Sequence, residues 1–158
     1  MKIAVFGATG ETGRRFCRRA LDAKHSVVGF SFRRTEIEGV DELRSTPIAL
    51  EDEAAVVEAL DGVDAIVSAI GGDKSTRSSA IDRLVRSAQK RGIQRIVSIG
   101  GAGILTMPSG ELLKEQPFFP DFLVPISNAH QDAWKVLEAS GLQWTMICLL
   151  YTSPSPRD

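Results

Sequence analysis

The sequence predicts a doubly wound α/β fold of the Rossmann type, in which helices cover both faces of a parallel sheet in three αβα layers. Short apolar runs rich in β-branched residues alternate with helix-period stretches, and this alternation is typical of βαβ units. The runs are apolar throughout, as in a sheet that is buried on both faces. A glycine-rich turn also joins the first run to the first helical stretch. The predicted strand order is 3-2-1-4-5-6.

The expected elements follow the chain in that alternation. Strands are expected at residues 2–6, 26–32, 47–50, 65–69, 95–99 and 143–147. Helices are expected at 12–23, 53–60, 79–91 and 129–140, the last with Asn128 as N-cap and Gln131 completing a capping box. Residues 105–126 lack a regular pattern. That segment is either a lid or binding loop, or a surface loop pinned to the core by its phenylalanines.

Composition indicates one globular domain with a small-molecule partner. The 158 residues are 25% charged with a formal net charge of -1, which favours neither nucleic acid nor an anionic membrane. The two cysteines, Cys17 and Cys148, lack metal-ligand spacing, and neither a signal peptide nor an 18-residue apolar run is found. We therefore expect a cytoplasmic protein with no metal site. The composition leaves its oligomeric state open.

The turn after the first strand has the pattern G-x-x-G-x-x-G. Gly7 allows the tight turn, Gly10 lets a diphosphate approach bare backbone, and Gly13 lets the helix lie close to the strand. The N–H groups and the helix dipole then face the anion. The residues between the glycines complete the candidate loop: Thr9, Glu11 and Thr12. We expect the Glu11 carboxylate to face solvent. The alternative is that these glycines only make a turn.

Two arginines stand where the second strand ends. NAD-binding versions of this motif carry an acid about 20 residues beyond the glycines, which binds the ribose 2′-hydroxyl. Here that place holds Arg33 and Arg34, and the first carboxylate is Glu36. A guanidinium suits a 2′-phosphate, so the sequence favours NADP(H) as cofactor. The alternative is that the pair is only solubilising charge.

Four blocks of the chain resemble the atypical short-chain dehydrogenase/reductases of the NmrA-like, NAD(P)H-binding group, which includes the flavin/biliverdin-IXβ reductases. The blocks are residues 2–13, 62–67, 96–103 and 137–145. The resemblance implies a cytoplasmic reductase, or a relative that senses the redox state of NADP without turning it over. In many relatives an Asp after strand three contacts the adenine, whereas this chain has Ala49 and Leu50 there. Gly101 stands where the flavin/biliverdin-type reductases carry a Ser.

A Tyr-x-x-x-Lys pair, which classical short-chain dehydrogenases use as proton donor, is absent, because Ser155 follows Tyr151 at that spacing. His130 is the best remaining donor: it lies near the expected helix start, and similar reductases have a His at the matching place. The alternative is a structural histidine. Backbone near the nicotinamide ribose is expected from the residues that end strands four and five: Ala69, Ile70, Gly71, Gly100 and Gly101.

Our leading hypothesis is an NADP-dependent reductase domain that transfers hydride to a small or planar acceptor. The alternative is a non-catalytic NADP(H)-binding sensor, and an isomerase or epimerase is disfavoured by the missing Tyr/Lys pair. We expect residues 1–147 to form the NAD(P)-binding domain and 148–158 to be a disordered or artefactual tail. The tail resembles translated sequencing-adaptor read-through or is a Ser/Pro-rich terminus. In either case we expect the substrate-side elements to be missing.

Overall fold

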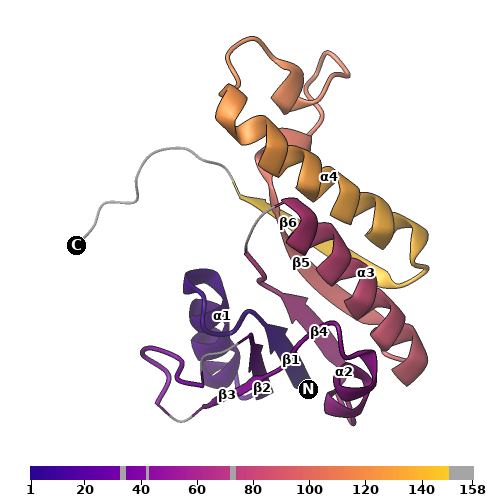
Figure 1. Ribbon diagram of the computed structural model, residues 1–158. Helices are drawn as coiled ribbons and strands as arrows, with labels where there is room; N and C mark the ends of the chain where they lie inside the picture. The colour runs from indigo at the N-terminus through magenta and orange to yellow at the C-terminus, as the bar shows by residue number, and fades with distance from the viewer. Residues whose placement is uncertain (33–34, 42, 72–73, 150–158) are drawn as a thin grey trace.

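The computed structural model describes residues 1–32, 35–41, 43–71 and 74–149, with backbone only at 74–76. Within them lies one parallel sheet in the order β3-β2-β1-β4-β5-β6, which confirms the predicted doubly wound fold (Figure 1). The strands are β1 (Lys2–Phe6), β2 (Ser26–Ser31), β3 (Ser45–Pro47), β4 (Ala65–Ser68), β5 (Arg95–Gly101) and β6 (Gln143–Leu149). The helices are α1 (Glu11–Asp22), α2 (Glu53–Ala59), α3 (Lys74–Arg91) and α4 (Val124–Ala139).

The central strands are apolar because both of their faces are covered. Strand β1 pairs in parallel with β2 on one side and with β4 on the other, so that Ala4 lies opposite both Val28 and Ile66. Four of its five residues are buried. The register brings the carboxyl ends of β1, β2 and β4 to one edge of the sheet, where ligands bind in open α/β folds.

Two apolar clusters fill the spaces on either side of the sheet. The larger one joins α2, α3 and α4 to the sheet and includes Ile66, Leu84 and Leu137, all completely buried. The smaller one places α1 against the opposite face through Cys17 and its neighbours. In Figure 1, α3 and α4 lie side by side over β5 and β6, away from α1. Helix α1 therefore covers only the first half of the sheet.

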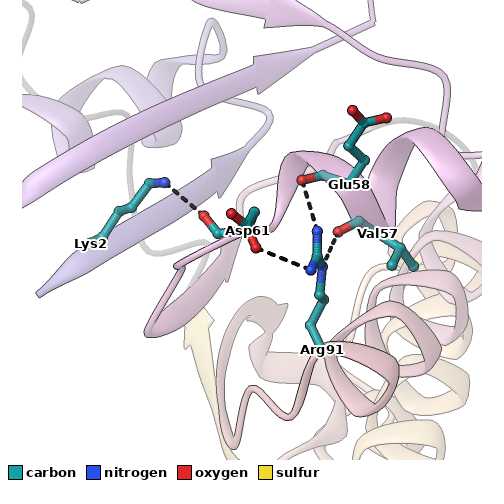
Figure 2. Close-up of polar contacts among 5 residues, drawn as sticks. All are labelled: Lys2, Val57, Glu58, Asp61 and Arg91. Atoms are coloured by element: carbon teal, nitrogen blue, oxygen red, sulfur yellow. Dashed lines mark hydrogen bonds and ion pairs between the residues drawn. The ribbon is translucent and has the colours of Figure 1, made fainter.

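Charged side chains tie the carboxyl end of α2 to its neighbours (Figure 2). The guanidinium of Arg91, on α3, donates to the carbonyl oxygens of Val57 at 2.5 Å and Glu58 at 3.3 Å, and lies 3.1 Å from the Asp61 carboxylate. From β1, Lys2 Nζ donates to the Asp61 carbonyl at 2.7 Å. The last carbonyls of a helix lack intrahelical donors, so these cations satisfy the end of α2.

Several elements differ from the sequence-based expectation, and β6 runs to Leu149, two residues into the predicted tail. Strand β3 lies at Ser45–Pro47 rather than 47–50, and α3 begins at Lys74 rather than near 79. Helix α4 begins at Val124, so the prediction that Asn128 caps it is wrong. Pro125 fits in its first turn, where a proline needs no N–H partner. The segment before α4 is also not free of regular structure, since it contains short 3-10 helices at Leu113–Glu115 and Asp121–Leu123.

The Asn128 and Gln131 side chains have a different partner from the one predicted. Lys114 Nζ donates to Asn128 Oδ1 at 2.5 Å and to Gln131 Oε1 at 2.6 Å. Both side chains lie within α4, because the helix begins at Val124. These two hydrogen bonds instead fasten the preceding segment to α4.

Candidate functional site

The glycine-rich turn needs glycine at two positions, Gly7 and Gly13. Gly7 has a φ of +81°, in the left-handed region, and a Cβ there would lie 2.6 Å from the Ala69 carbonyl oxygen. A Cβ on Gly13 would lie 2.1 Å from the Gly7 carbonyl oxygen. Gly10 is the N-cap of α1, with its N–H directed to the Gly7 carbonyl at 3.0 Å. The turn therefore presents bare backbone next to the start of α1.

The first turn of α1 has the properties of an anion site. Its N-cap provides no side-chain hydrogen bond, so the first N–H groups of the helix are not satisfied by a cap. The Glu11 side chain turns outward and binds Arg15 at 2.8 Å, and both side chains are more than half exposed. This confirms that the Glu11 carboxylate faces solvent. The positive end of the helix dipole stays available to a ligand.

A cavity of ≈ 580 Å³ opens beside this turn at the carboxyl edge of β1, β2 and β4. Its volume lies within the usual range for small-molecule sites. Six of the predicted cofactor residues line it: Gly7, Thr9, Gly10, Ala69, Ile70 and Gly71. The stacked rings of Phe6 and Phe30, with centroids 4.8 Å apart, also line it. The cavity thus connects the glycine turn to the end of β4.

The part of the cavity beside β2 and β3 is apolar. Phe32, Ile48 and Leu50 line it, and Phe32 is 66% exposed. No aspartate stands at Ala49 or Leu50, so an adenine there would be held by apolar contact. Glu51 lies at the rim, where a backbone hydrogen bond and then its bond to Arg83, 2.6 Å away, lower the pKa of its carboxyl group.

His130 lies apart from this cavity, packed against the end of β5. It is 3% exposed, and a Cβ on Gly101 would lie 2.9 Å from its Cδ2 atom. The absence of a side chain at Gly101 is what makes room for the imidazole. Arg77, on α3, brings its Nη1 within 3.4 Å of His130 Nε2. A guanidinium can only donate, so this contact favours the tautomer with the proton on Nδ1.

Burial, followed by the positive charge of Arg77, lowers the pKa of His130 to about 4. At neutral pH the imidazole is therefore uncharged. Because α4 begins at Val124, His130 lies in its second turn, where the helix dipole has little effect. On the same helix, Trp134 lines a different cavity, and Leu137 is buried in the core.

The remaining predicted cofactor residues that the structure describes do not line the cavity. Glu11, Thr12 and Gly13 adjoin the cavity through α1 but do not line it, and Gly100 and Gly101 lie in β5. A Cβ on Gly100 would lie 2.6 Å from Met146 Cγ, so this glycine serves the packing of β5 against β6. Arg33 and Arg34 lie outside the described residues.

Sequence reasoning missed several residues that the fold brings to these places. Ser31, Ile48, Leu50 and Glu51 line the cavity because β3 pairs with β2, and only the apolar pattern around residue 48 indicated that strand. Arg77 had no local signal, since it meets His130 from 53 residues away in the chain.

A family model described as NAD(P)H-binding matches residues 7–155. The chain belongs to this NAD(P)H-binding family. Solved structures agree with that family and with the predicted resemblance to atypical short-chain dehydrogenase/reductases. A Burkholderia pseudomallei protein described as exported is 33% identical, with a TM-score of 0.82 over 92% of this chain and 70% of that one. A Streptococcus pneumoniae protein named as an NADH-flavin reductase is 27% identical, with a TM-score of 0.77 over the same shares of both chains.

More distant structures share the fold of this NAD(P)H-binding family. A Bacteroides thetaiotaomicron protein named as an epimerase has a TM-score of 0.80 at 22% identity, over 92% of this chain and 68% of that one. Among the residues that the structure describes, no helix has the length and apolar character needed to span a bilayer. The same residues contain no cluster of side chains that could hold a metal ion.

Proposed function

We propose that residues 1–147 form the NADP(H)-binding domain of a reductase that passes hydride to a small or planar acceptor. The observation that carries this proposal is the cavity beside the glycine turn, which joins bare backbone at the start of α1 to an apolar end near Leu50. Such a cavity suits a molecule with a diphosphate at its middle and a planar ring at its end. The nicotinamide, when bound, supplies the hydride.

In this proposal the residues of the chain bind and orient the dinucleotide. The N–H groups at the start of α1 hold the diphosphate, with Gly10 and Thr9 beside it. Phe32 and Leu50 contact the adenine ring. Arg33 and Arg34 bind the 2′-phosphate, and Gly71 lets the backbone approach the nicotinamide ribose. A larger side chain at Gly10 would occupy space that the cofactor needs.

His130 is buried behind Gly101 and its Nε2 faces Arg77, so in this proposal it acts through Nδ1–H, as a neutral hydrogen-bond donor to an acceptor bound at the end of β5. With its pKa lowered to about 4 it carries no imidazolium proton at neutral pH, so the proton that follows the hydride comes from water. A neutral imidazole can still polarise a carbonyl group. The NADH-flavin reductase named among the similar structures supports an acceptor with a planar ring system.

Calorimetry on Gly10→Val tests the diphosphate site. Gly10 has a φ of -75° and a ψ of 163°, which valine adopts readily, so the variant should fold while its side chain blocks the diphosphate. We expect NADPH binding to be lost with the unfolding midpoint nearly unchanged. NADPH affinity equal to that of the parent chain would overturn the proposal.

Arg33→Asp tests the choice of cofactor. Loss of one charge-assisted hydrogen bond to the 2′-phosphate should reduce the NADPH/NADH affinity ratio by roughly 10- to 100-fold. Arg86→Asp makes the same change of charge on α3, where Arg86 pairs with the nearby Asp82 carboxylate at 2.6 Å, and should leave the ratio unchanged. An unaltered ratio in Arg33→Asp would remove the 2′-phosphate argument.

Consumption of NADPH separates a reductase from a sensor. A reductase oxidises NADPH when a flavin or a quinone is supplied, and the loss of absorbance at the nicotinamide band measures it. Tight NADPH binding with no oxidation by either acceptor would instead favour the non-catalytic sensor.

A further inference from the structure

A second cavity, of ≈ 320 Å³, lies between α4, β6 and the segment that follows β5. It shares no lining residue with the cavity beside the glycine turn. The two tryptophans of the chain both line it, Trp134 from α4 and Trp144 from β6, together with Met146 from the same strand. Two indoles and a thioether favour contact with a flat aromatic ring.

The segment after β5 that covers this cavity is a hairpin held by internal hydrogen bonds. Thr106 and Leu112 form an antiparallel bridge, and the Leu113 N–H donates to the Leu105 carbonyl at 2.8 Å. Lys114 then fastens this hairpin to α4. The cavity is therefore preformed, which lowers the entropic cost of filling it.

The lining of the cavity is uncharged. None of its described residues is acidic or basic. Cys148 also lines it, and burial raises the pKa of this thiol, so it stays protonated at neutral pH. A charged ligand would lose its hydration against this lining, and the nearby Lys114 ammonium is already bonded to Asn128 and Gln131, so the lining favours an uncharged ligand.

One polar group in the lining has a fixed orientation. Because an ammonium group can only donate, the bond from Lys114 Nζ fixes Gln131 Oε1 toward the lysine and leaves the NH2 end of the amide as a donor. Within the part of the chain that the structure describes, that NH2 group has no protein acceptor. The cavity thus combines aromatic walls with an amide donor of fixed orientation, beside the Thr106 hydroxyl and the two indole N–H groups of the lining.

We propose that this second cavity binds an uncharged, planar aromatic molecule that carries a carbonyl group, with the ring between Trp134 and Trp144 and the carbonyl oxygen accepting from Gln131. This site is separate from the proposed dinucleotide site and does not depend on it. The ligand class follows from the uncharged lining, the two indoles and the oriented amide.

Nuclear magnetic resonance of the full chain labelled with 15N tests the proposal, because each tryptophan gives one indole N–H signal. The probe is 2-acetylnaphthalene, and 2-ethylnaphthalene is the matched molecule without the carbonyl. We expect both indole signals to shift with either probe, and the acetyl probe to bind about 5-fold more tightly through its hydrogen bond. Saturating NADPH should not displace the probe. Unshifted indole signals would overturn the site.

Gln131→Glu is the informative variant, because it keeps the size of the side chain and its contact with Lys114 but removes the NH2 donor. We expect this variant to lose the preference for the acetyl probe over the ethyl probe. Gln131→Leu removes the donor without adding a charge and should give the same loss of preference. A preference that survives in both variants would overturn the role of Gln131, and failure of NADPH binding would leave this test unaffected.

Discussion

At the scale of single residues, Gly13 shows how a missing side chain positions the proposed diphosphate site. A Cβ at this position would overlap the Gly7 carbonyl oxygen, 2.1 Å away, and its neighbours there are backbone atoms that cannot rotate aside. We expect Gly13→Ala to lower the free energy of unfolding by about 1–3 kcal/mol, as in other overpacked interiors, and to weaken NADPH binding. Urea unfolding and calorimetry measure the two effects.

Gly71→Ala is the matched control, because a Cβ there meets no atom within 4 Å. Its urea midpoint should stay close to that of the parent chain. If Gly13→Ala were as stable as Gly71→Ala, the close contact between α1 and the turn would not constrain the fold.

His130 makes the stability of the chain depend on pH. Its pKa is about 4 in the folded chain against 6.5 for an unperturbed histidine, so the unfolded chain binds the proton more readily between these values. The free energy of unfolding therefore keeps its full value above pH 6.5 and falls by up to about 3 kcal/mol as the pH decreases toward 4. We expect His130→Gln to flatten this part of the urea unfolding profile. His25→Gln, at the other histidine, should leave it in place.

At the scale of elements, the end of α2 depends on Arg91 from α3 (Figure 2). We expect Arg91→Ala to lower the free energy of unfolding by about 1–2 kcal/mol, since the Val57 carbonyl loses its side-chain donor and the Asp61 carboxylate loses its ion pair. Arg86→Ala, on the same helix, removes only a half-exposed pair with Asp82 and should cost less than about 0.5 kcal/mol. Equal losses in the two variants, measured by urea unfolding, would contradict the capping role.

The elements also show what sequence can predict and what it cannot. Both ends of strand β1 were predicted correctly, because an apolar run that ends in a glycine turn is typical of a buried strand. The start of helix α4 was predicted wrongly, because Asn128 and Gln131 have the spacing of a helix cap but bind Lys114 instead. Lys114 lies 14 and 17 residues away in the sequence, and such a contact leaves no local pattern. Strand β3 has only three residues, and its position in the chain is set by its pairing with β2.

The candidate site also contains some residues that a local sequence pattern predicted and others that only the tertiary structure brings there. The glycine turn and the end of β4 were predicted as cavity residues from spacing alone, because both follow strands that lie side by side. The apolar wall at Ile48 and the contact between Arg77 and His130 depend on tertiary structure. Gly101 was predicted to lie near the nicotinamide ribose and was noted as a departure from related reductases, whereas its role in making room for the imidazole ring of His130 was not predicted.

At the scale of the whole molecule, the two sides of the sheet are covered unequally. Helices α3 and α4 cover β5 and β6 on one side, while α1 on the other side reaches only the first strands. Strand β6 is the last in the described sheet order, and its Ile147 and Leu149 side chains are 47% and 44% exposed. An apolar strand at the edge of a sheet is a template for pairing with another chain.

This exposed edge predicts self-association that rises with concentration. Ile147→Lys should reduce the association measured by sedimentation velocity, because a lysine on an edge strand opposes pairing, and should change the free energy of unfolding by less than about 0.5 kcal/mol. Gln143→Lys adds the same charge to β6 at an exposed polar position and should have a smaller effect, since the apolar surface remains. A parent chain that stays monomeric at every concentration would show that Ile147 and Leu149 are too small a surface to hold two copies together.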